Sequence, residues 1–380
     1  MKKIYITSLH LDHGGIEMAI SSLANALVKR DYEVEILCTY NLGEPVYYLD
    51  DKVTVTYLTE VKPNKKAFLN ALRQKNIFKI FKEGIYSLKV LYLKKRVLKE
   101  QFRAIKDDII ISTRNEDSVL LSKYGNKNTL KIAQLHHDHR FDKKLIHDFK
   151  NNYKNIDVFT LLTDELQQEV SEMMANNKHT KCITMPNFLP DSNNVKIAEA
   201  ERKNQVVAVG RLHEVKGFLR LIDIWAKVAE KSDTVLKIIG NGEQELALKN
   251  RIKELGLDKR VILTGAMNHS DVLREMRNSL FYVMTSFTEG FPFVLIEAMS
   301  QGLPVVAFDV RVGPRAIIQN EKNGFLVEDN NQDDFVNRVI YLIENHTTRE
   351  EMSKSAYLRA DDFAESNIVE KWKYVLNNKE

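Results

Sequence analysis

Short apolar runs alternate with amphipathic stretches along the first half of the chain. The runs are rich in Ile, Val and Leu, which favours buried β-strands. Between the first two runs, residues 16–28 place apolar side chains at helical spacing. This alternation predicts a parallel sheet with helices on both faces. The strands expected in this half are 3–8, 34–39, 53–58, 108–113, 130–135 and 158–163.

The same alternation begins again after residue 204. The intervening segment 188–204 is polar and starts beside two prolines, so we expect it to be a linker. The predicted domains are therefore 1–187 and 205–362, followed by a terminal helix at about 363–380. The strands expected in the second domain are 205–209, 235–239, 261–264, 281–286 and 305–308.

The composition is that of a globular protein in a reducing compartment. Of the 380 residues, 44% are hydrophobic and 28% are charged. The two cysteines, Cys38 and Cys182, provide no disulfide framework. The longest uncharged runs are 11 residues, against the roughly 20 that a membrane span requires. We expect a cytoplasmic protein.

The stretch 281–308 contains the most informative motif. An apolar strand is followed by the loop 288–292, a short helix at 293–300 and a second strand. The free amides at the start of such a helix can bind an anion. Glu289 and Glu297 lie on either side of this point, and carboxylates accept hydrogen bonds from hydroxyls. A sugar nucleotide has both kinds of group. The alternative is a βαβ unit with an exposed helix glutamate.

Two cations follow the first strand of the second domain. Arg211 comes directly after Gly210, and Lys216 precedes the next helix, so both fall at the carboxyl edge of the sheet. The alternative is a pair of solvated surface cations. The chain has no Gly-Lys-Ser/Thr loop and no Asp-x-Asp pair, and Glu245 occupies the last glycine position of a dinucleotide fingerprint after Gly240 and Gly242. We therefore expect no metal and no cofactor, and a diphosphate neutralised by cations and helix amides.

Two loops follow strands of the first domain. Gly14 and Gly15 allow a close approach of backbone amides to a phosphate, or else form a tight turn. The cluster 136–139, His-His-Asp-His, directly follows the strand 130–135. Zinc needs three or four converging ligands, and no further partner is evident, so we expect no metal. His136 is the residue best placed to point into a cleft, although a solvated turn is an equal alternative.

These motifs resemble the retaining glycosyltransferases of family 4. The resemblance covers nearly the whole chain and is carried by the segments 14–17, 210–217, 240–243, 289–297 and 302–306. It implies the α/β GT-B fold, in which two Rossmann-like doubly wound domains face each other across a cleft and the terminal helix at about 363–380 crosses back onto the first domain. It also implies transfer of a hexose or N-acetylhexosamine from a nucleotide sugar, which we expect to be UDP-linked.

The resemblance further implies a role for each site residue. Arg211 and Lys216 would bind the donor diphosphate, Glu289 the transferred sugar, and Glu297 the ribose. His136 would line the reaction centre. The remaining donor-binding residues implied are Gly14, Gly15, Gly210, Gly242, Gly290, Phe291, Phe293, Val294 and Leu295.

One loop departs from the family pattern. Many relatives have a glycine pair followed by a glutamate after the strand 305–309, whereas this chain has Arg315 and Ala316 in the corresponding segment 312–318. The Gly-Pro form of this loop resembles that of enzymes that synthesise bacterial envelope polysaccharides and wall polymers. We therefore expect an envelope glycan or lipid-linked acceptor. The alternative function is a non-catalytic GT-B subunit that binds glycan or a partner enzyme.

Charge is concentrated in one stretch. The whole chain has a net charge of +4, but residues 62–106, from Lys62 to Lys106, contain fourteen Lys and Arg and only two acidic residues. Aromatic and aliphatic side chains alternate with the cations, a pattern typical of helices that lie on anionic membranes. We expect a peripheral location at the inner membrane face. The alternative is a solvated helical pair with buried aromatic residues; no nucleic-acid-binding motif accompanies the charge.

Overall fold

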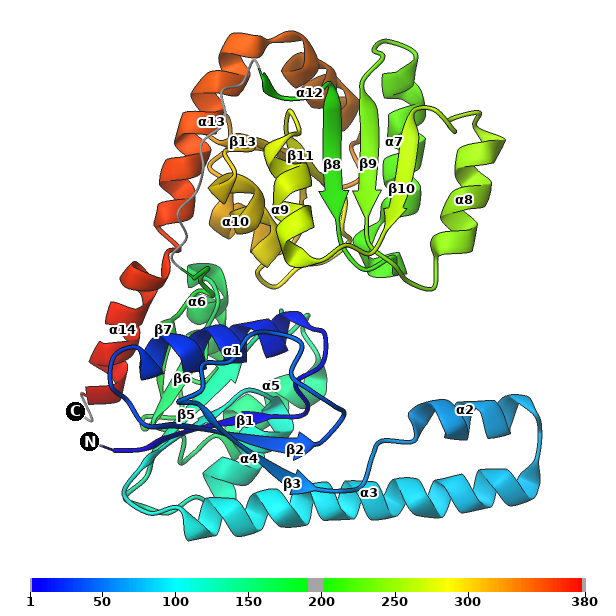
Figure 1. Ribbon diagram of the computed structural model, residues 1–380. Coiled ribbons are helices and arrows are strands. Elements are labelled where there is room, and N and C mark those ends of the chain that lie inside the picture. Colours follow the sequence, from blue (N-terminus) through cyan, green and yellow to red (C-terminus); the bar gives the residue numbers. More distant parts are fainter. Residues whose placement is uncertain (1, 191–200, 378–380) are drawn as a thin grey trace. The chain divides into compact units, whose positions relative to one another are not determined.

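The computed structural model describes residues 2–190 and 201–377 (Figure 1). The chain forms two compact units. The N-terminal unit comprises Met1–Met185 together with Val369–Glu380, and the C-terminal unit comprises Pro186–Ile368. Residues 191–200 of the predicted linker and residues 378–380 of the predicted terminal helix lie outside the described residues.

The N-terminal unit contains a seven-stranded parallel sheet in the order β3-β2-β1-β4-β5-β6-β7. The β1 strand pairs with β2 through Ile4 and Val34, and with β4 through Ile4 and Ile109. The central strands are buried on both faces and are therefore almost entirely apolar. The strands are β1 (Ile4–Ser8), β2 (Val34–Tyr40), β3 (Thr54–Thr59), β4 (Ile109–Ser112), β5 (Leu130–Leu135), β6 (Val158–Leu161) and β7 (Lys181–Thr184).

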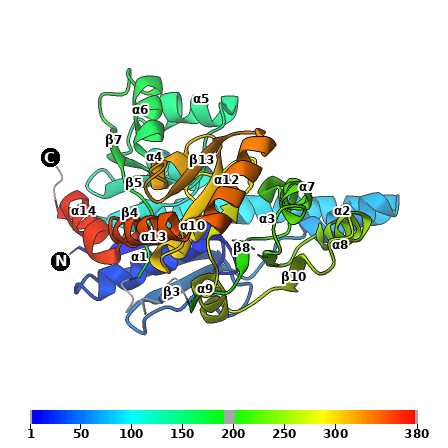
Figure 2. The same ribbon diagram turned by 90° about the horizontal axis from the view of Figure 1, so that it is seen from above.

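Helices connect these parallel strands. Figures 1 and 2 show that they lie on both faces of the sheet. Each helix buries one apolar face; α1, for example, buries Ile20, Leu23 and Leu27. The connecting helices are α1 (Gly15–Val28), α4 (Asn115–Tyr124), α5 (Lys143–Asn152) and α6 (Asp164–Met173), and α14 (Glu365–Asn377) ends the described chain.

A helical hairpin occupies the connection between β3 and β4. It consists of α2 (Lys65–Arg73) and α3 (Ile77–Ala104), and in both ribbon views it extends past the sheet of its own unit. The C-terminal part of α3 is anchored by Leu98 and Phe102, which are fully buried. No helix in the ranges 2–190 and 201–377 is long and apolar enough to cross a membrane.

The first part of α3 presents an apolar stripe to solvent. Nine of the nineteen exposed large hydrophobic side chains in the described residues belong to α2 and α3. Those on α3 recur every three or four residues and so lie along one helix face. The alternative of a solvated helical pair with buried aromatic residues is therefore wrong in the burial of Phe78, Phe81 and Tyr92, although the helical pair itself is present. The stripe consists of Ile77, Phe78, Phe81, Ile85, Leu88, Leu91 and Tyr92.

The C-terminal unit contains a six-stranded parallel sheet in the order β10-β9-β8-β11-β12-β13. Its core includes Trp225, Phe281 and Phe308, all fully buried. The strands are β8 (Gln205–Val209), β9 (Val235–Ile239), β10 (Val261–Gly265), β11 (Tyr282–Met284), β12 (Val305–Asp309) and β13 (Gly324–Glu328). The helices are α7 (Phe218–Ala229), α8 (Glu245–Glu254), α9 (His269–Arg277), α10 (Phe293–Ser300), α11 (Gly313–Ile317), α12 (Gln332–Glu344) and α13 (His346–Asp361).

The predicted α/β architecture with two parallel sheets is confirmed. Strands β5, β8 and β9 and helix α10 have the predicted limits, and most other strands differ by one or two residues. Strands β7 and β13 and helices α12 and α13 were not predicted from the pattern, whereas α14 lies within the predicted terminal helix.

A close approach at Gly217 joins α7 to the end of β11. Gly217 has φ of +65°, and a Cβ at this position would lie 2.0 Å from the carbonyl oxygen of Thr285. Only glycine meets both requirements at little cost. Gly256 has the same φ, but a Cβ there would meet nothing within 4 Å.

These two glycines separate steric overlap from backbone strain. Gly256→Ala should lower the free energy of unfolding by about 1 kcal/mol, the cost of a left-handed alanine. Gly217→Ala should lower it by about 3 kcal/mol or more, because overlap adds to the strain. Calorimetric unfolding of the full chain measures both; equal losses would contradict the close approach.

Candidate functional site

The carboxyl edge of the C-terminal sheet gathers most of the predicted donor-binding residues. Gly210 and Arg211 follow β8, Gly242 follows β9, and the loop 285–292 leads from β11 to α10. In open parallel sheets ligands bind at this edge. Arg211 is exposed to solvent.

Lys216 and Glu289 form the central ion pair of this edge. The Lys216 Nζ lies 2.6 Å from Glu289 Oε1, and the Ser286 hydroxyl donates to the same oxygen at 2.7 Å. The Glu289 side chain is only 11% exposed. A cation and a carboxylate of the predicted site therefore meet, although 73 residues separate them in sequence.

Arg220 fixes the strand end that carries this pair, and it is absent from the residues predicted from sequence. Its guanidinium donates to the carbonyls of Thr285 at 2.6 Å and Ser286 at 2.5 Å, and it pairs with Asp329 at 2.9 Å. It also stacks on Phe287. A cation within the apolar run Phe-Leu-Arg-Leu-Ile was the available sequence indication, because an arginine on a buried helix face needs partners.

Helix α10 begins at the loop that carries Glu289. Pro292 precedes it, and no side chain caps the amides of its first turn. The amides of Phe293 and Val294 are therefore available to an anion, whereas the Leu295 amide donates to the Pro292 carbonyl at 3.0 Å. Gly290 lies in the loop and Leu295 in the first turn. The Phe291 ring is buried and packs against Phe363 at 5.4 Å between ring centres.

Glu297 lies one turn inside α10. It is 8% exposed, and its Oε1 lies 2.9 Å from His269 Nε2. Glu297 raises the pKa of His269 through this hydrogen bond. His269 is also absent from the residues predicted from sequence, because its position in α9 gives no indication of this pairing.

The loop after β12 packs against Glu289. Val312 has φ of +59° although it is β-branched and fully buried, and it pairs with Glu289 through the backbone. This is real backbone strain beside the site. Arg315, which lies where many family members have an acidic residue, binds Asp309 at 2.9 Å.

The carboxyl edge of the N-terminal sheet gathers a second set of polar residues. Gly14 and Gly15 lie at the start of α1. Glu17, in the first turn of this helix, is buried, and its Oε1 accepts a hydrogen bond from the Arg114 guanidinium at 2.9 Å. Arg114 comes two residues after the end of β4, which lies next to β1. Arg114 was not predicted, although its place after an apolar strand was a usable indication.

His136 directly follows β5 at the same edge. Both ring nitrogens are shielded from solvent and have no hydrogen-bond partner in the described chain. Burial lowers the pKa of His136 to about 3, with smaller contributions from His137 and Arg114. The imidazole is therefore neutral at pH 7. His139 instead binds Glu169 at 2.9 Å.

Metal ligands do not converge in the described structure. Within residues 2–190 and 201–377, no three His, Cys, Asp or Glu side chains lie together so as to hold a metal ion.

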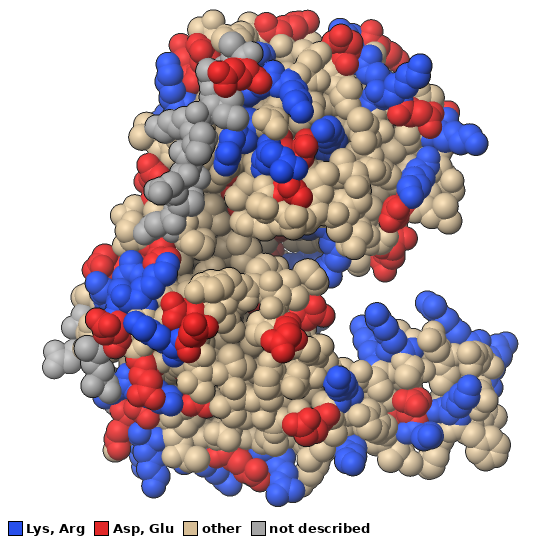
Figure 3. All heavy atoms as spheres, in the orientation of Figure 1, with Lys and Arg blue, Asp and Glu red and all other residues tan. Residues whose placement is uncertain are grey.

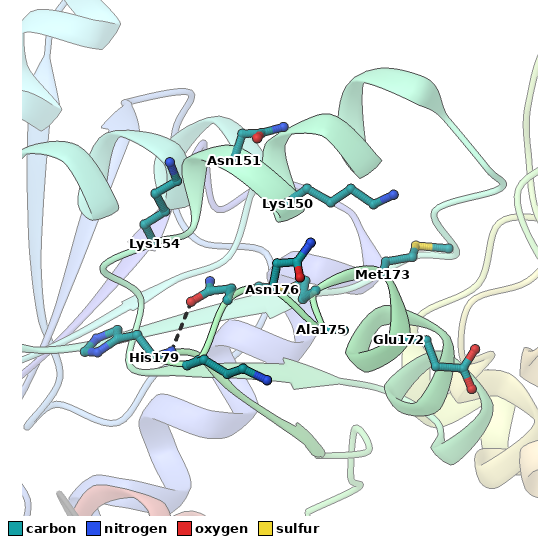
Figure 4. A pocket seen from close by; sticks show the side chains of 11 residues that line it. Lys150, Asn151, Lys154, Glu172, Met173, Ala175, Asn176 and His179 are labelled. Carbon is teal, nitrogen blue, oxygen red and sulfur yellow. Dashed lines mark hydrogen bonds between the residues drawn. The ribbon is translucent and has the colours of Figure 1, made fainter.

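A separate pocket of about 770 Å³ lies at the opposite, amino-terminal edge of the N-terminal sheet (Figure 4). It is lined by the ends of α5 and α6, including Lys150, Lys154, Glu172 and His179. None of the predicted site residues lies in it.

The pKa values of the buried His136 and the more exposed His269 should be shifted in opposite directions. His136 should remain neutral from pH 8 to pH 5, because burial lowers its pKa, whereas His269 should take up its proton above the ordinary value of about 6.5. NMR of histidine-labelled protein, with signals assigned from His136→Gln and His269→Gln, measures both. Protonation of His136 near pH 6.5 would contradict its burial.

Several known glycosyltransferases are similar to this chain in sequence. Residues 191–359 match the family described as Glycosyl transferases group 1. The chain is 29% identical over 384 residues to an uncharacterized glycosyltransferase of Haemophilus influenzae, covering 99% of this chain and 100% of that protein. It is 28% identical over 334 residues to the poly(ribitol-phosphate) alpha-N-acetylglucosaminyltransferase of Staphylococcus aureus, covering 84% of this chain and 62% of that protein.

Solved structures share the fold. Staphylococcus aureus TarM, in a complex with UDP, superposes with a TM-score of 0.77 at 18% identity and full coverage of both chains. Pneumococcal GtfA, in complex with UDP and GlcNAc, superposes with a TM-score of 0.78 at 16% identity, covering 100% of this chain and 99% of that chain. The chain therefore has the GT-B fold, and its residues 191–359 are similar to the glycosyl transferases group 1 family.

Proposed function

We propose that this protein is a retaining glycosyltransferase of family 4 that uses a UDP-linked hexose or N-acetylhexosamine. The observation that carries the proposal is the meeting of Lys216 and Glu289 beside the uncapped start of α10. Glu297 lies one turn further along the same helix. One β-loop-α unit thus offers helix amides for the diphosphate, Glu289 for the sugar and Glu297 for the ribose.

The ion pair suggests how the donor is received. Without donor, Lys216 and Glu289 satisfy each other. A bound donor offers its diphosphate to Lys216 and Arg211 and its sugar hydroxyls to Glu289, so each group gains a new partner. The amides of Phe293 and Val294 add positive potential at the leaving diphosphate. The leaving group is then stabilised without a metal.

To retain the configuration at the anomeric carbon, the acceptor hydroxyl must attack this carbon on the face from which the nucleotide departs. In the family mechanism that we adopt, the leaving phosphate accepts the proton of the acceptor hydroxyl, so no protein base is needed. A neutral His136 suits this scheme, because it can exchange hydrogen bonds with hydroxyls without adding positive charge.

The acceptor is inferred from relatives and from the hairpin. A Campylobacter jejuni relative, 25% identical over 378 residues with 98% and 97% coverage, is named for transfer of N-acetylgalactosamine to an undecaprenol-linked glycan. The Staphylococcus aureus relative is named for transfer to poly(ribitol-phosphate). Both names support an envelope glycan or lipid-linked acceptor.

The hairpin supports a peripheral location at the cytoplasmic membrane face. The exposed stripe of α3 offers aromatic side chains such as Phe78 and Phe81, which are 89% and 71% exposed. Figure 3 shows Lys and Arg side chains gathered on the same hairpin. Each cation near an anionic surface contributes about 1 kcal/mol, and each buried aromatic ring about 2 kcal/mol.

Donor turnover tests the site. Screening nucleotide sugars for hydrolysis without acceptor should identify a UDP-sugar, and Lys216→Ala and Glu289→Ala should each lower its turnover about a hundredfold or more, because each removes a group that binds the reacting donor. Lys227→Ala is the matched control, since Lys227 also forms a 2.7 Å carboxylate pair but on the surface. Full activity in both site variants would refute the assignment.

Vesicle flotation tests the membrane surface. The chain should float with vesicles containing anionic lipid and lose at least about tenfold in bound fraction when Phe78 and Phe81 are both changed to Ser, because their burial drives insertion. Leu358→Ser is the control, since Leu358 is 70% exposed on α13. Absence of flotation at low salt would exclude this surface.

A further inference from the structure

The carboxylate proposed to hold the ribose has a protein partner that the family resemblance does not supply. His269 is the first residue of α9, and its Nε2 lies 2.9 Å from Glu297 Oε1. The two residues come from neighbouring helices of the same unit, so the pairing depends on the fold and not on local sequence.

The environments of the two partners are unequal. The Glu297 side chain is 11% exposed, whereas the His269 side chain is 62% exposed. In the described part of the chain, His269 is the one residue whose side chain hydrogen-bonds to the Glu297 carboxylate. A hydrogen bond from a neighbouring helix favours one orientation of a buried carboxylate over the others.

The geometry leaves acceptor capacity for a ligand. A carboxylate has about four lone-pair sites on two oxygens, and His269 occupies one site on Oε1. The second oxygen, Oε2, and the remaining site on Oε1 can receive two hydroxyl donors. Two adjacent hydroxyls are what the ribose of a nucleotide presents.

We infer that His269 is a positioning residue, which holds the Glu297 carboxylate in the orientation that accepts the two ribose hydroxyls of the donor nucleotide. The inference rests on the proposed function, because it presupposes a ribonucleotide at Glu297. It adds a residue that acts through the carboxylate without itself touching the reacting atoms.

A purely stabilising role predicts different behaviour. An ion pair with one largely exposed member contributes little to stability, and its loss would weaken every nucleotide alike. A positioning role instead concerns only ligands that have ribose hydroxyls. The two roles therefore separate when a ribonucleotide is compared with its dideoxy analogue.

Calorimetric titration of the full chain with UDP and with 2′,3′-dideoxyuridine diphosphate makes this comparison. His269→Ala should weaken UDP binding about tenfold, the effect of one well-oriented hydrogen bond, and leave the dideoxy affinity unchanged. His269→Gln should retain most of the UDP affinity, because its amide keeps an N–H donor. In a Glu297→Gln background, His269→Ala should have no further effect. His346→Ala is the matched control, since His346 is an exposed histidine that also begins a helix of this unit.

These measurements distinguish a failure of the positioning role of His269 from a failure of the proposed glycosyltransferase function. If His269→Ala weakens UDP and the dideoxy analogue equally, or if His269→Gln is as weak as His269→Ala, the positioning role is overturned while nucleotide binding stands. If the unaltered chain binds neither nucleotide, the proposed function fails and the inference fails with it.

Discussion

The guanidinium of Arg220 holds the C-terminal unit's candidate site in place. It donates to the carbonyls of Thr285 and Ser286 at the point where β11 ends, and these residues lead directly into the loop that carries Glu289. A carbonyl at a strand end has lost its ladder partner and, when buried, needs another donor. Arg220 supplies it from α7, so helix and strand end are joined at the point where Lys216 and Glu289 meet.

Gly217 makes that junction sterically possible. It brings the start of α7 within contact of the Thr285 carbonyl, which places Lys216 and Arg220 on either side of the β11 end. Ser286 then donates to the same carboxylate oxygen as Lys216. The loop 285–292 is thus fixed at its start by Arg220 and at Glu289 by Lys216, which come from one neighbouring helix and its preceding turn.

The sequence was sufficient for the architecture and for much of the site, and the failures have physical causes. Apolar runs such as 205–209 mark strands because both faces of a parallel sheet are buried. The short edge strand β7, Lys-Cys-Ile-Thr, is only half-buried and lacks that pattern. Glu289 and Lys216 could be selected because each lies in a strand-end motif. Arg220 and Arg114 left weaker indications, on an apolar helix and after an apolar strand, and His269 left none, because its role depends on the tertiary contact with Glu297. The hairpin pattern in 62–106 was visible, but only the structure shows that α3 buries Leu98 and Phe102 while leaving Phe78 and Phe81 exposed.

The central claim is that a sugar nucleotide binds at the start of α10, held by the groups that converge there. A crystal structure of the full chain with UDP tests it most directly. The account predicts the diphosphate beside Lys216 and the first amides of α10, with the ribose hydroxyls within about 3 Å of the Glu297 carboxylate. UDP bound elsewhere, with the Lys216–Glu289 pair undisturbed and Glu297 bound to His269 alone, would contradict it.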